Sequence, residues 1–210
     1  MAVAEDAEPA RRAAAWAGIP WDAGTEAALS RYAEWLRSEA IPAGGLGPAE
    51  ADRIWSRHIA DSLLFAGCWR HPQPPADLMD IGSGVGLPGI PLAVVWPACS
   101  VTLLDRSQRR ATLARRAVHI LGLGNVEVVV GEAHGHARKH SLVVSRATLA
   151  PEEALALGRS LCRPGGVVIV GLTHGGDAAE PVLAGVETVV VPEAVLDSPA
   201  RLLRMAIDGA

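Results

Sequence analysis

Lysine, aromatic residues and cysteine are all scarce in this chain of 210 residues. Lys139 is the only lysine, so the basic side chains are almost all arginine. Cys68, Cys99 and Cys162 lie far apart and form no Cys-x-x-Cys pair, which argues for reduced, packed thiols rather than disulfides or a zinc site. The net charge of −4 gives no overall electrostatic reason to bind nucleic acid.

Long apolar runs are missing as well. The N-terminal segment is acidic and then basic with no apolar centre, so no signal peptide is predicted. The run from Ile90 to Cys99 is too short to span a bilayer, and Pro91 and Pro97 interrupt it. With half of the residues apolar and a fifth charged, we expect a cytoplasmic protein with a folded core and no membrane partner.

Two regions of the chain differ in pattern. Residues 1–70 contain no strand-like run and predict helices over 24–40, with Thr25 as N-cap, and over 48–67, beginning at Pro48. The proline-rich connector 71–77 is the expected boundary. The prediction is therefore an N-terminal helical region of residues 1–70 and a second domain of residues 71–210.

The second region alternates between strand and helix patterns. Helical patterns over 87–96 and 107–122 separate short apolar runs, which predicts an α/β, Rossmann-like fold whose mostly parallel sheet is buried on both faces. Two late runs predict a closing antiparallel hairpin, giving seven strands. The expected strands are residues 78–81, 100–105, 126–130, 141–145, 166–170, 186–191 and 201–207. Ligands of such sheets bind at the carboxyl ends of the strands.

The stretch "DIGSGVGLPGIP" (80–91) offers two interpretations. Gly84, Gly86 and Gly89 form the G-x-G-x-x-G of dinucleotide sites, whereas Asp80 followed by Gly82, Gly84 and Gly86 is typical of S-adenosylmethionine (SAM) sites. Both use glycines that let the backbone turn tightly and a ligand approach closely. A turn without any ligand is the least favoured alternative, because alternating glycines at a strand end contribute little to packing.

The surroundings of this loop favour SAM over NAD. A carboxylate at Asp80 suits the cationic amino group of SAM and would be poorly placed against a pyrophosphate. Asp105, at the end of the second strand, suits ribose hydroxyls of either cofactor. The segment "LCRPGGVVIV" (161–170), with its Pro-Gly-Gly turn, recurs before the fifth strand of SAM methyltransferases. We therefore expect a class I SAM-dependent methyltransferase domain.

Further motifs carry a family resemblance over about residues 45–207. The chain resembles the glucose-inhibited division protein B family, the 16S ribosomal RNA guanine-N7 methyltransferases. The segments that carry it are, in order, "RHIADSL" (57–63), "DIGSGVGLPGIPLAVVWP" (80–97), "VTLLDRSQRR" (101–110), "LGLGNVEVVVGEA" (121–133) and "VVSRA" (143–147).

The resemblance implies SAM as cofactor and 16S rRNA or the small ribosomal subunit as partner. The expected cofactor residues are Asp80, Gly82, Ser83, Gly84, Gly86, Leu87, Asp105, Arg106, Glu132, Ala133 and Arg146. Within this set the glycine loop would hold the methionine end, Asp105 the ribose, and Glu132 with Ala133 the adenine. The expected substrate residues are Arg57, His58, Asp61, Ser62, Arg109, Arg110 and Thr173.

Arg146 and His58 are the expected catalytic residues, acting by positioning. Guanine N7 is a bare lone pair, so its methylation needs no general base, and arginine suits contact with guanine O6 and N7. His58, Asp61 and Ser62 have the i, i+3, i+4 spacing of one helix face. By spacing alone this face would simply pack on the loop; the resemblance favours a substrate role. It is not a serine-hydrolase triad.

Several patterns leave alternatives open. "GLG" (45–47) and Thr173 replace polar and basic residues of the family, so the acceptor is either RNA or a small molecule such as a nucleoside or natural product. A binding scaffold without catalysis is the third alternative. The arginines between Arg106 and Arg116 form either a solvated helix face or a phosphate-facing patch. The histidines at 134, 136 and 140 favour an ordinary loop over a metal site.

Overall fold

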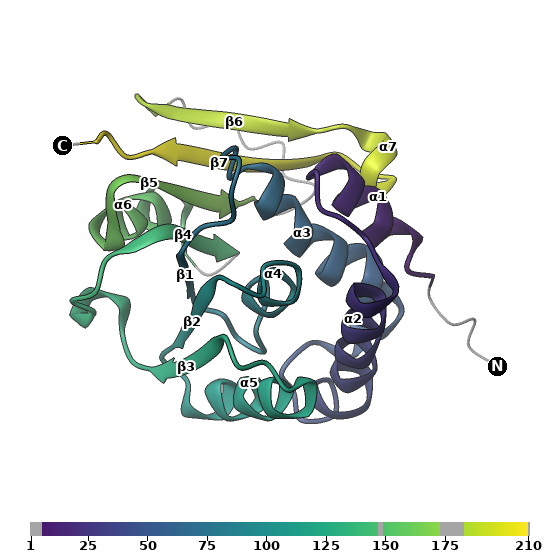
Figure 1. The fold of residues 1–210 in the computed structure, drawn as a ribbon. Coiled ribbons are helices and arrows are strands. Elements are labelled where there is room, and N and C mark those ends of the chain that lie inside the picture. The colour runs from purple at the N-terminus through teal and green to yellow at the C-terminus, as the bar shows by residue number, and fades with distance from the viewer. Residues whose placement is uncertain (1–5, 147–148, 173–182, 210) are drawn as a thin grey trace.

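The computed structural model describes residues 6–146, 149–172 and 183–209, which form a seven-stranded sheet and the helices around it (Figure 1). The first five strands are parallel, and β7 runs antiparallel to both β5 and β6. The predicted α/β fold with a closing antiparallel hairpin is confirmed. Across the sheet the order is β3 (Val126–Val130), β2 (Ser100–Asp105), β1 (Asp77–Ile81), β4 (His140–Arg146), β5 (Cys162–Gly171), β7 (Ala200–Ala206) and β6 (Val186–Val191).

Strand β5 begins earlier than the sequence pattern predicts. The Gly165 N–H donates to the Ile207 carbonyl at 2.9 Å, and the Ile207 N–H donates to the Gly166 carbonyl at 2.9 Å. The expected Pro-Gly-Gly turn is therefore paired with the chain that follows β7. A local shift in the pairing of β4 with β5 accommodates these residues. Residues 164–166, predicted as a turn before the strand, therefore lie within β5, and the predicted start of this strand at residue 166 is wrong.

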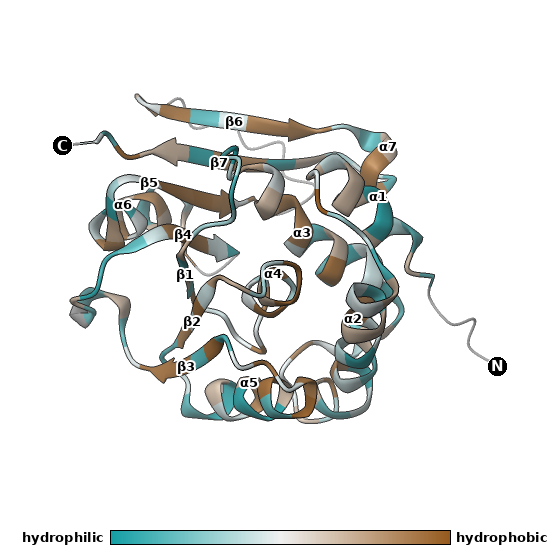
Figure 2. Ribbon diagram, viewed as in Figure 1, coloured by the Kyte–Doolittle hydropathy of each residue, from teal (hydrophilic) through white to brown (hydrophobic). Residues whose placement is uncertain are grey.

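Helices cover both faces of the sheet. Helices α3 (Ala60–Gly67), α4 (Gly89–Val95) and α5 (Gln108–Leu121) lie on one face, and α6 (Pro151–Leu161) lies on the other (Figure 1). Each side has its own cluster of buried apolar residues. Figure 2 shows the inner strands mainly brown and α5 banded brown and teal, as expected for a half-buried helix.

The N-terminal helices depart from the predicted ones. Helix α2 (Ala23–Trp35) follows α1 (Glu8–Trp16), and its N-cap is Asp22, whose carboxylate accepts the Thr25 N–H at 2.7 Å, so the predicted Thr25 cap is wrong. It continues as a π-helical turn, Leu36–Ala40. The predicted helix 48–67 is three segments: a 3₁₀ segment η2 (Pro48–Arg53), a π-helical turn η3 (Ile54–Ile59) and α3. Such π-helical turns concentrate at functional sites.

The N-terminal helices share one apolar core with the sheet, which includes residues from Ala7 to Leu202. Helix α1 also contacts the short helix α7 (Glu193–Leu196), where Arg12 Nε donates to the Val195 carbonyl at 3.1 Å. The Tyr32 hydroxyl on α2 donates to the Val85 carbonyl in the glycine-rich loop at 3.0 Å. A division into domains at residues 71–77 stays a prediction. Among the described helices, none combines the length and apolarity needed to cross a bilayer.

Candidate functional site

A cavity of about 680 Å³ lies at the carboxyl ends of the parallel strands. Its walls are the loop after β1, the ends of β2 and β4, the segment after β3, and a strip from η2, η3 and α3. This volume falls in the usual range for small-molecule sites. The predicted site residues that line it are Arg57, His58, Asp61, Gly82, Ser83, Gly84, Leu87, Asp105, Arg106, Arg110, Glu132, Ala133 and Arg146.

The glycine-rich loop forms the base of the cavity. Gly82, Gly84 and Gly86 all have positive φ, at 70°, 60° and 105°, which favours glycine. A Cβ on Gly84 would meet nothing within 4 Å, so its Cα faces open space. A Cβ on Gly86 would instead lie 2.3 Å from Ile90 Cδ1. Gly86 therefore makes the turn and does not line the cavity, which corrects its predicted cofactor contact.

Asp80 also lies behind the cavity wall. Its side chain is fully buried, and its Oδ2 accepts the N–H of Gly89, the first residue of α4, at 2.8 Å. Burial raises the pKa of Asp80 to about 7, against the lowering effects of this hydrogen bond and of the Arg146 charge. The predicted contact between Asp80 and a cationic amino group needs correction: Asp80 supports the loop from below.

Asp105 faces the cavity and ties the loop to β2. One carboxylate oxygen accepts the Gly84 N–H at 2.9 Å, and the other accepts the Ser107 N–H at 2.8 Å. Arg110 Nε lies 3.4 Å away. Since each carboxylate oxygen has two lone pairs, Asp105 retains acceptor capacity for a ligand.

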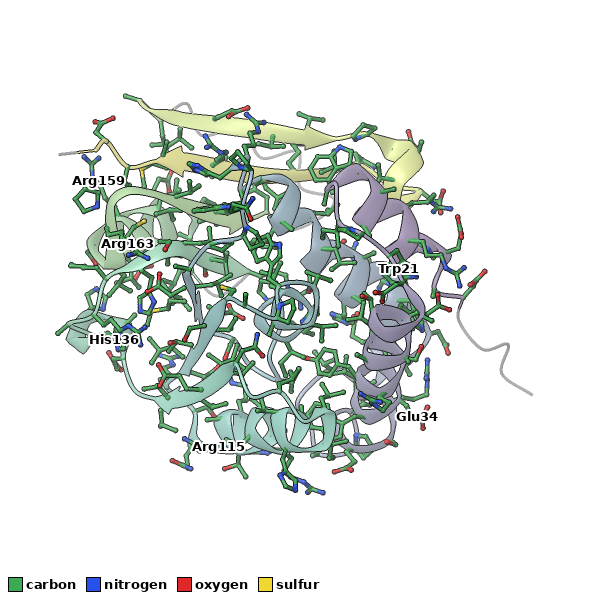
Figure 3. All side chains as sticks on the ribbon, viewed as in Figure 1. Trp21, Glu34, Arg115, His136, Arg159 and Arg163 are labelled. Atoms are coloured by element: carbon green, nitrogen blue, oxygen red, sulfur yellow. The ribbon has the colours of Figure 1, made fainter. Side chains whose placement is uncertain are left out.

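The segment that follows β3 supplies another part of the cavity lining. Glu132 and Ala133, two of the predicted cofactor residues, follow β3 and line the cavity. His134 also lines it, from a short 3₁₀ turn, η4 (Ala133–Gly135), in the segment between β3 and β4 that was predicted to be a loop. His136, labelled in Figure 3, instead faces His140, with 3.5 Å between their Nε2 atoms. Within the described ranges, no three His, Cys, Asp or Glu residues are grouped so that they could hold a metal ion.

His58 and Arg146 meet on the opposite wall, together with Glu50. Arg146 Nη2 lies 3.3 Å from His58 Nδ1, and Glu50 Oε2 lies 3.0 Å from His58 Nε2. Arg146 Nη1 also donates to the Arg57 carbonyl at 3.2 Å. Burial and the Arg146 charge lower the pKa of His58 to about 4, although Glu50 acts to raise it. The imidazole is therefore neutral at neutral pH.

Ser62 has a different place from the one predicted. It is fully buried, and its hydroxyl donates to the His58 carbonyl at 2.6 Å. The i, i+4 spacing brings it to the backbone of His58 and not to the cavity. Its predicted substrate contact is corrected to support of the π-helical turn that carries His58.

The arginines of the 106–116 segment are exposed but mostly engaged. Arg109 donates to the Ala43 carbonyl, Arg115 donates to the Val128 carbonyl at 3.0 Å, and Arg116 pairs with Glu39. Arg106 and Arg110 reach the cavity, whereas Arg109 does not line it. These contacts favour a solvated helix face over a continuous phosphate-facing patch.

Other residues that line the cavity were not predicted from the sequence. Glu50 gave only a weak signal, since it lies eight positions before His58 and the π-helical turn between them alters the usual helical spacing. Apolar lining residues were indistinguishable from core. The missed set is Gly45, Leu46, Glu50, Ile81, Val85, Leu104, Gly131, His134, Leu149, Glu153, Leu157 and Leu172. Thr173, a predicted substrate residue, lies outside the described residues.

The sheet order, the glycine-rich loop and the cavity at the strand ends define a Rossmann-like fold of the class I methyltransferase type. A mutant of MtNAS solved in complex with S-adenosylmethionine has a TM-score of 0.58 at 16% identity, covering 88% of this chain and 73% of that chain. At this identity the likeness shows the fold alone.

The family is shown by sequence. The model of GidB, rRNA small subunit methyltransferase G, matches residues 25–180, and the chain belongs to this family. Ribosomal RNA small subunit methyltransferase G of Leifsonia xyli subsp. xyli is 34% identical, over 82% of this chain and 86% of the relative. The protein of that name from Acidothermus cellulolyticus is 38% identical, but the match spans 66% of this chain and only 61% of the relative. The predicted family is confirmed.

Proposed function

We propose that this chain is a SAM-dependent methyltransferase that methylates guanine N7 in 16S rRNA of the small ribosomal subunit. The observation that carries the proposal is one cavity with two kinds of wall. Gly84 and Asp105 form one wall, and His58 with Arg146 forms another. Membership of the GidB family supports this chemistry and this substrate. A ribosomal substrate would place the chain in the cytoplasm.

The residues present fit the cofactor. Open space over Gly84 leaves room for its methionine end, and Asp105 has lone pairs for ribose hydroxyls. Glu132 and Ala133 would flank the adenine. When bound, SAM supplies a methyl group on a positively charged sulfur. The site then has to hold a nucleophile in line with that methyl group.

The protein's own residues suit positioning rather than proton transfer. Guanine N7 needs no base, and His58 is held between Glu50 and Arg146 instead of being free to carry a proton. An Arg146 N–H would donate to guanine O6 and so orient the neighbouring N7. Arg57, Arg106 and Arg110 line the cavity and would meet phosphates. Roles for Arg109 and Thr173 stay predictions.

Replacing Gly84 by alanine is expected to weaken SAM binding by tenfold or more, because the methyl group would enter the ligand's space. Gly122→Ala is the matched control: its φ is +67°, and its Cβ would also meet nothing within 4 Å, but it lies at the end of α5. Both changes should cost about 1 kcal/mol in backbone strain. Calorimetric titration with SAM would contradict the assignment if both variants bound equally well.

Labelled SAM tests the function directly. The chain is incubated either with small ribosomal subunits that lack the modification or with a metabolite extract. Label at guanine N7 of 16S rRNA is the expected result. Label found solely in a small molecule would show that the substrate is that molecule and not 16S rRNA. SAM binding without any methyl transfer would indicate a binding scaffold.

A further inference from the structure

The Glu50–His58–Arg146 chain links three segments that are distant in sequence. Glu50 belongs to η2, His58 to the π-helical turn η3, and Arg146 to the end of β4. All three line the cavity. The two links are 3.0 Å and 3.3 Å long, within hydrogen-bonding reach.

The direction of both hydrogen bonds follows from the chemistry of the groups. A guanidinium has only N–H donors, so His58 Nδ1 must present its lone pair to Arg146. In a neutral ring the proton then lies on Nε2 and is donated to the Glu50 carboxylate. The low pKa of His58, about 4, agrees with a ring that accepts at Nδ1.

Burial and backbone contacts fix the ring in this position. His58 is 8% exposed, and the Ser62 hydroxyl holds its carbonyl at 2.6 Å. Glu50 has a second neighbour, Arg53, at 3.9 Å, but that arginine is half-exposed, and exposed ion pairs contribute little. The contact with His58 is therefore the better explanation for the place of Glu50.

We propose that Glu50 is a positioning residue of the transfer site: it holds His58 as the Nε2–H tautomer, and the Nδ1 lone pair in turn orients the Arg146 guanidinium at the cavity wall. The effect on catalysis rests on the function proposed above. The tautomer and its dependence on Glu50 do not.

The first test is spectroscopic and needs no substrate. In ¹⁵N-labelled protein, the Nε2–H of His58 should be visible and slow to exchange with water. Glu50→Ala should abolish that slow exchange, and Glu50→Gln, which retains an acceptor oxygen, should largely restore it. Asp52→Ala is the control, since Asp52 is exposed in the same 3₁₀ segment. A proton on Nδ1 in the unsubstituted chain, or slow exchange unaffected in Glu50→Ala, would overturn the proposal.

The second test is kinetic. Glu50→Ala should lower kcat by roughly tenfold, less than the hundredfold cost of a 1 Å misplacement at the reacting centre, and should leave SAM affinity within about twofold. Glu50→Gln should recover most of the loss. Added to His58→Ala, the Glu50→Ala change should have no further effect on kcat, because Glu50 acts through the ring. If the losses in kcat from Glu50→Ala and His58→Ala were fully additive in the double variant, Glu50 would not act through His58. Absence of methyl transfer in the unsubstituted chain would contradict the proposed function, while the ring-proton test would still decide the positioning link.

Discussion

Arg146→Ala is expected to lower the rate of methyl transfer by about a hundredfold or more. The guanidinium is held by the Arg57 carbonyl at 3.2 Å and by His58 Nδ1 at 3.3 Å, so both ends of its planar fork are used. The negative charges of Asp61 and Asp80 act on it as well. Its removal leaves buried carboxylates without their counter-charge, and we expect unfolding to become easier by about 3–5 kcal/mol.

The Arg146→Lys variant distinguishes a loss of methyl transfer caused by unfolding from a loss caused by altered hydrogen-bond geometry at this residue. Lysine keeps the positive charge but cannot donate along two fixed directions from one planar group. This variant should remain folded and still lose at least tenfold in single-turnover methyl transfer. Arg159→Ala is the control, because Arg159 is exposed on α6 and is not one of the residues that line the cavity. A lysine variant with the unsubstituted rate would exclude a positioning role for Arg146.

Asp80→Asn is expected to change how stability depends on pH. Burial raises the pKa of Asp80 from 3.8 to about 7 in the folded chain. Below pH 3.8 the Asp80 carboxyl is protonated in both the folded and the unfolded chain. Between pH 3.8 and about 7 it is ionised only in the unfolded chain, so the free energy of unfolding falls as the pH rises. Above about pH 7 it is ionised in both, and the loss is complete. At roughly 1.4 kcal/mol per pH unit, the full effect is about 4 kcal/mol.

The asparagine variant retains an acceptor for the Gly89 N–H without the titrating proton. Relative to the unsubstituted chain, it should gain about 2–3 kcal/mol in free energy of unfolding by urea between pH 5 and pH 8. Comparing the variant with the unsubstituted chain cancels the contributions of His58 and His140. The pKa values of these two histidines are lowered to about 4, so they make stability rise with pH, opposite to the effect of Asp80.

Asp77→Asn, at the start of the same strand, is the control for Asp80. Burial acts to raise the pKa of Asp77, but hydrogen bonds from Ser141 and the charge of Arg163 outweigh it and lower the pKa. Asp77 is therefore ionised in both states over this pH range, and its variant should show a constant difference in stability. A constant difference for Asp80→Asn as well would contradict the raised pKa.

The strands were predictable because a parallel sheet covered on both faces needs short, continuous apolar runs. β2, β3 and β6 begin and end where the sequence predicts. The cavity residues were harder to predict. Nothing in the spacing of the glycine-rich loop showed that Asp80 would face α4 and that Gly86 would pack against Ile90.

Gly45 illustrates the same limit. In the sequence it stands where the family has a polar residue. In the structure a Cβ at Gly45 would lie 2.5 Å from Val85 Cγ1 and 3.0 Å from Leu113 Cδ1. Close contact of this segment with the glycine-rich loop and with α5 thus explains this glycine, and such a contact between distant segments leaves no local pattern.

The packing of α1 against α7 bears on how the chain matures. Arg12 and Val195, which join these helices, are separated by 183 positions. Helix α1 packs on α3 and η3, which follow it closely in the sequence, and also on α7, which is synthesised only after most of the chain. Closing so large a loop is a late and slow event. The contact between α1 and α7 is therefore expected to form late, and α7 should be among the last helices to acquire protection from hydrogen exchange during refolding.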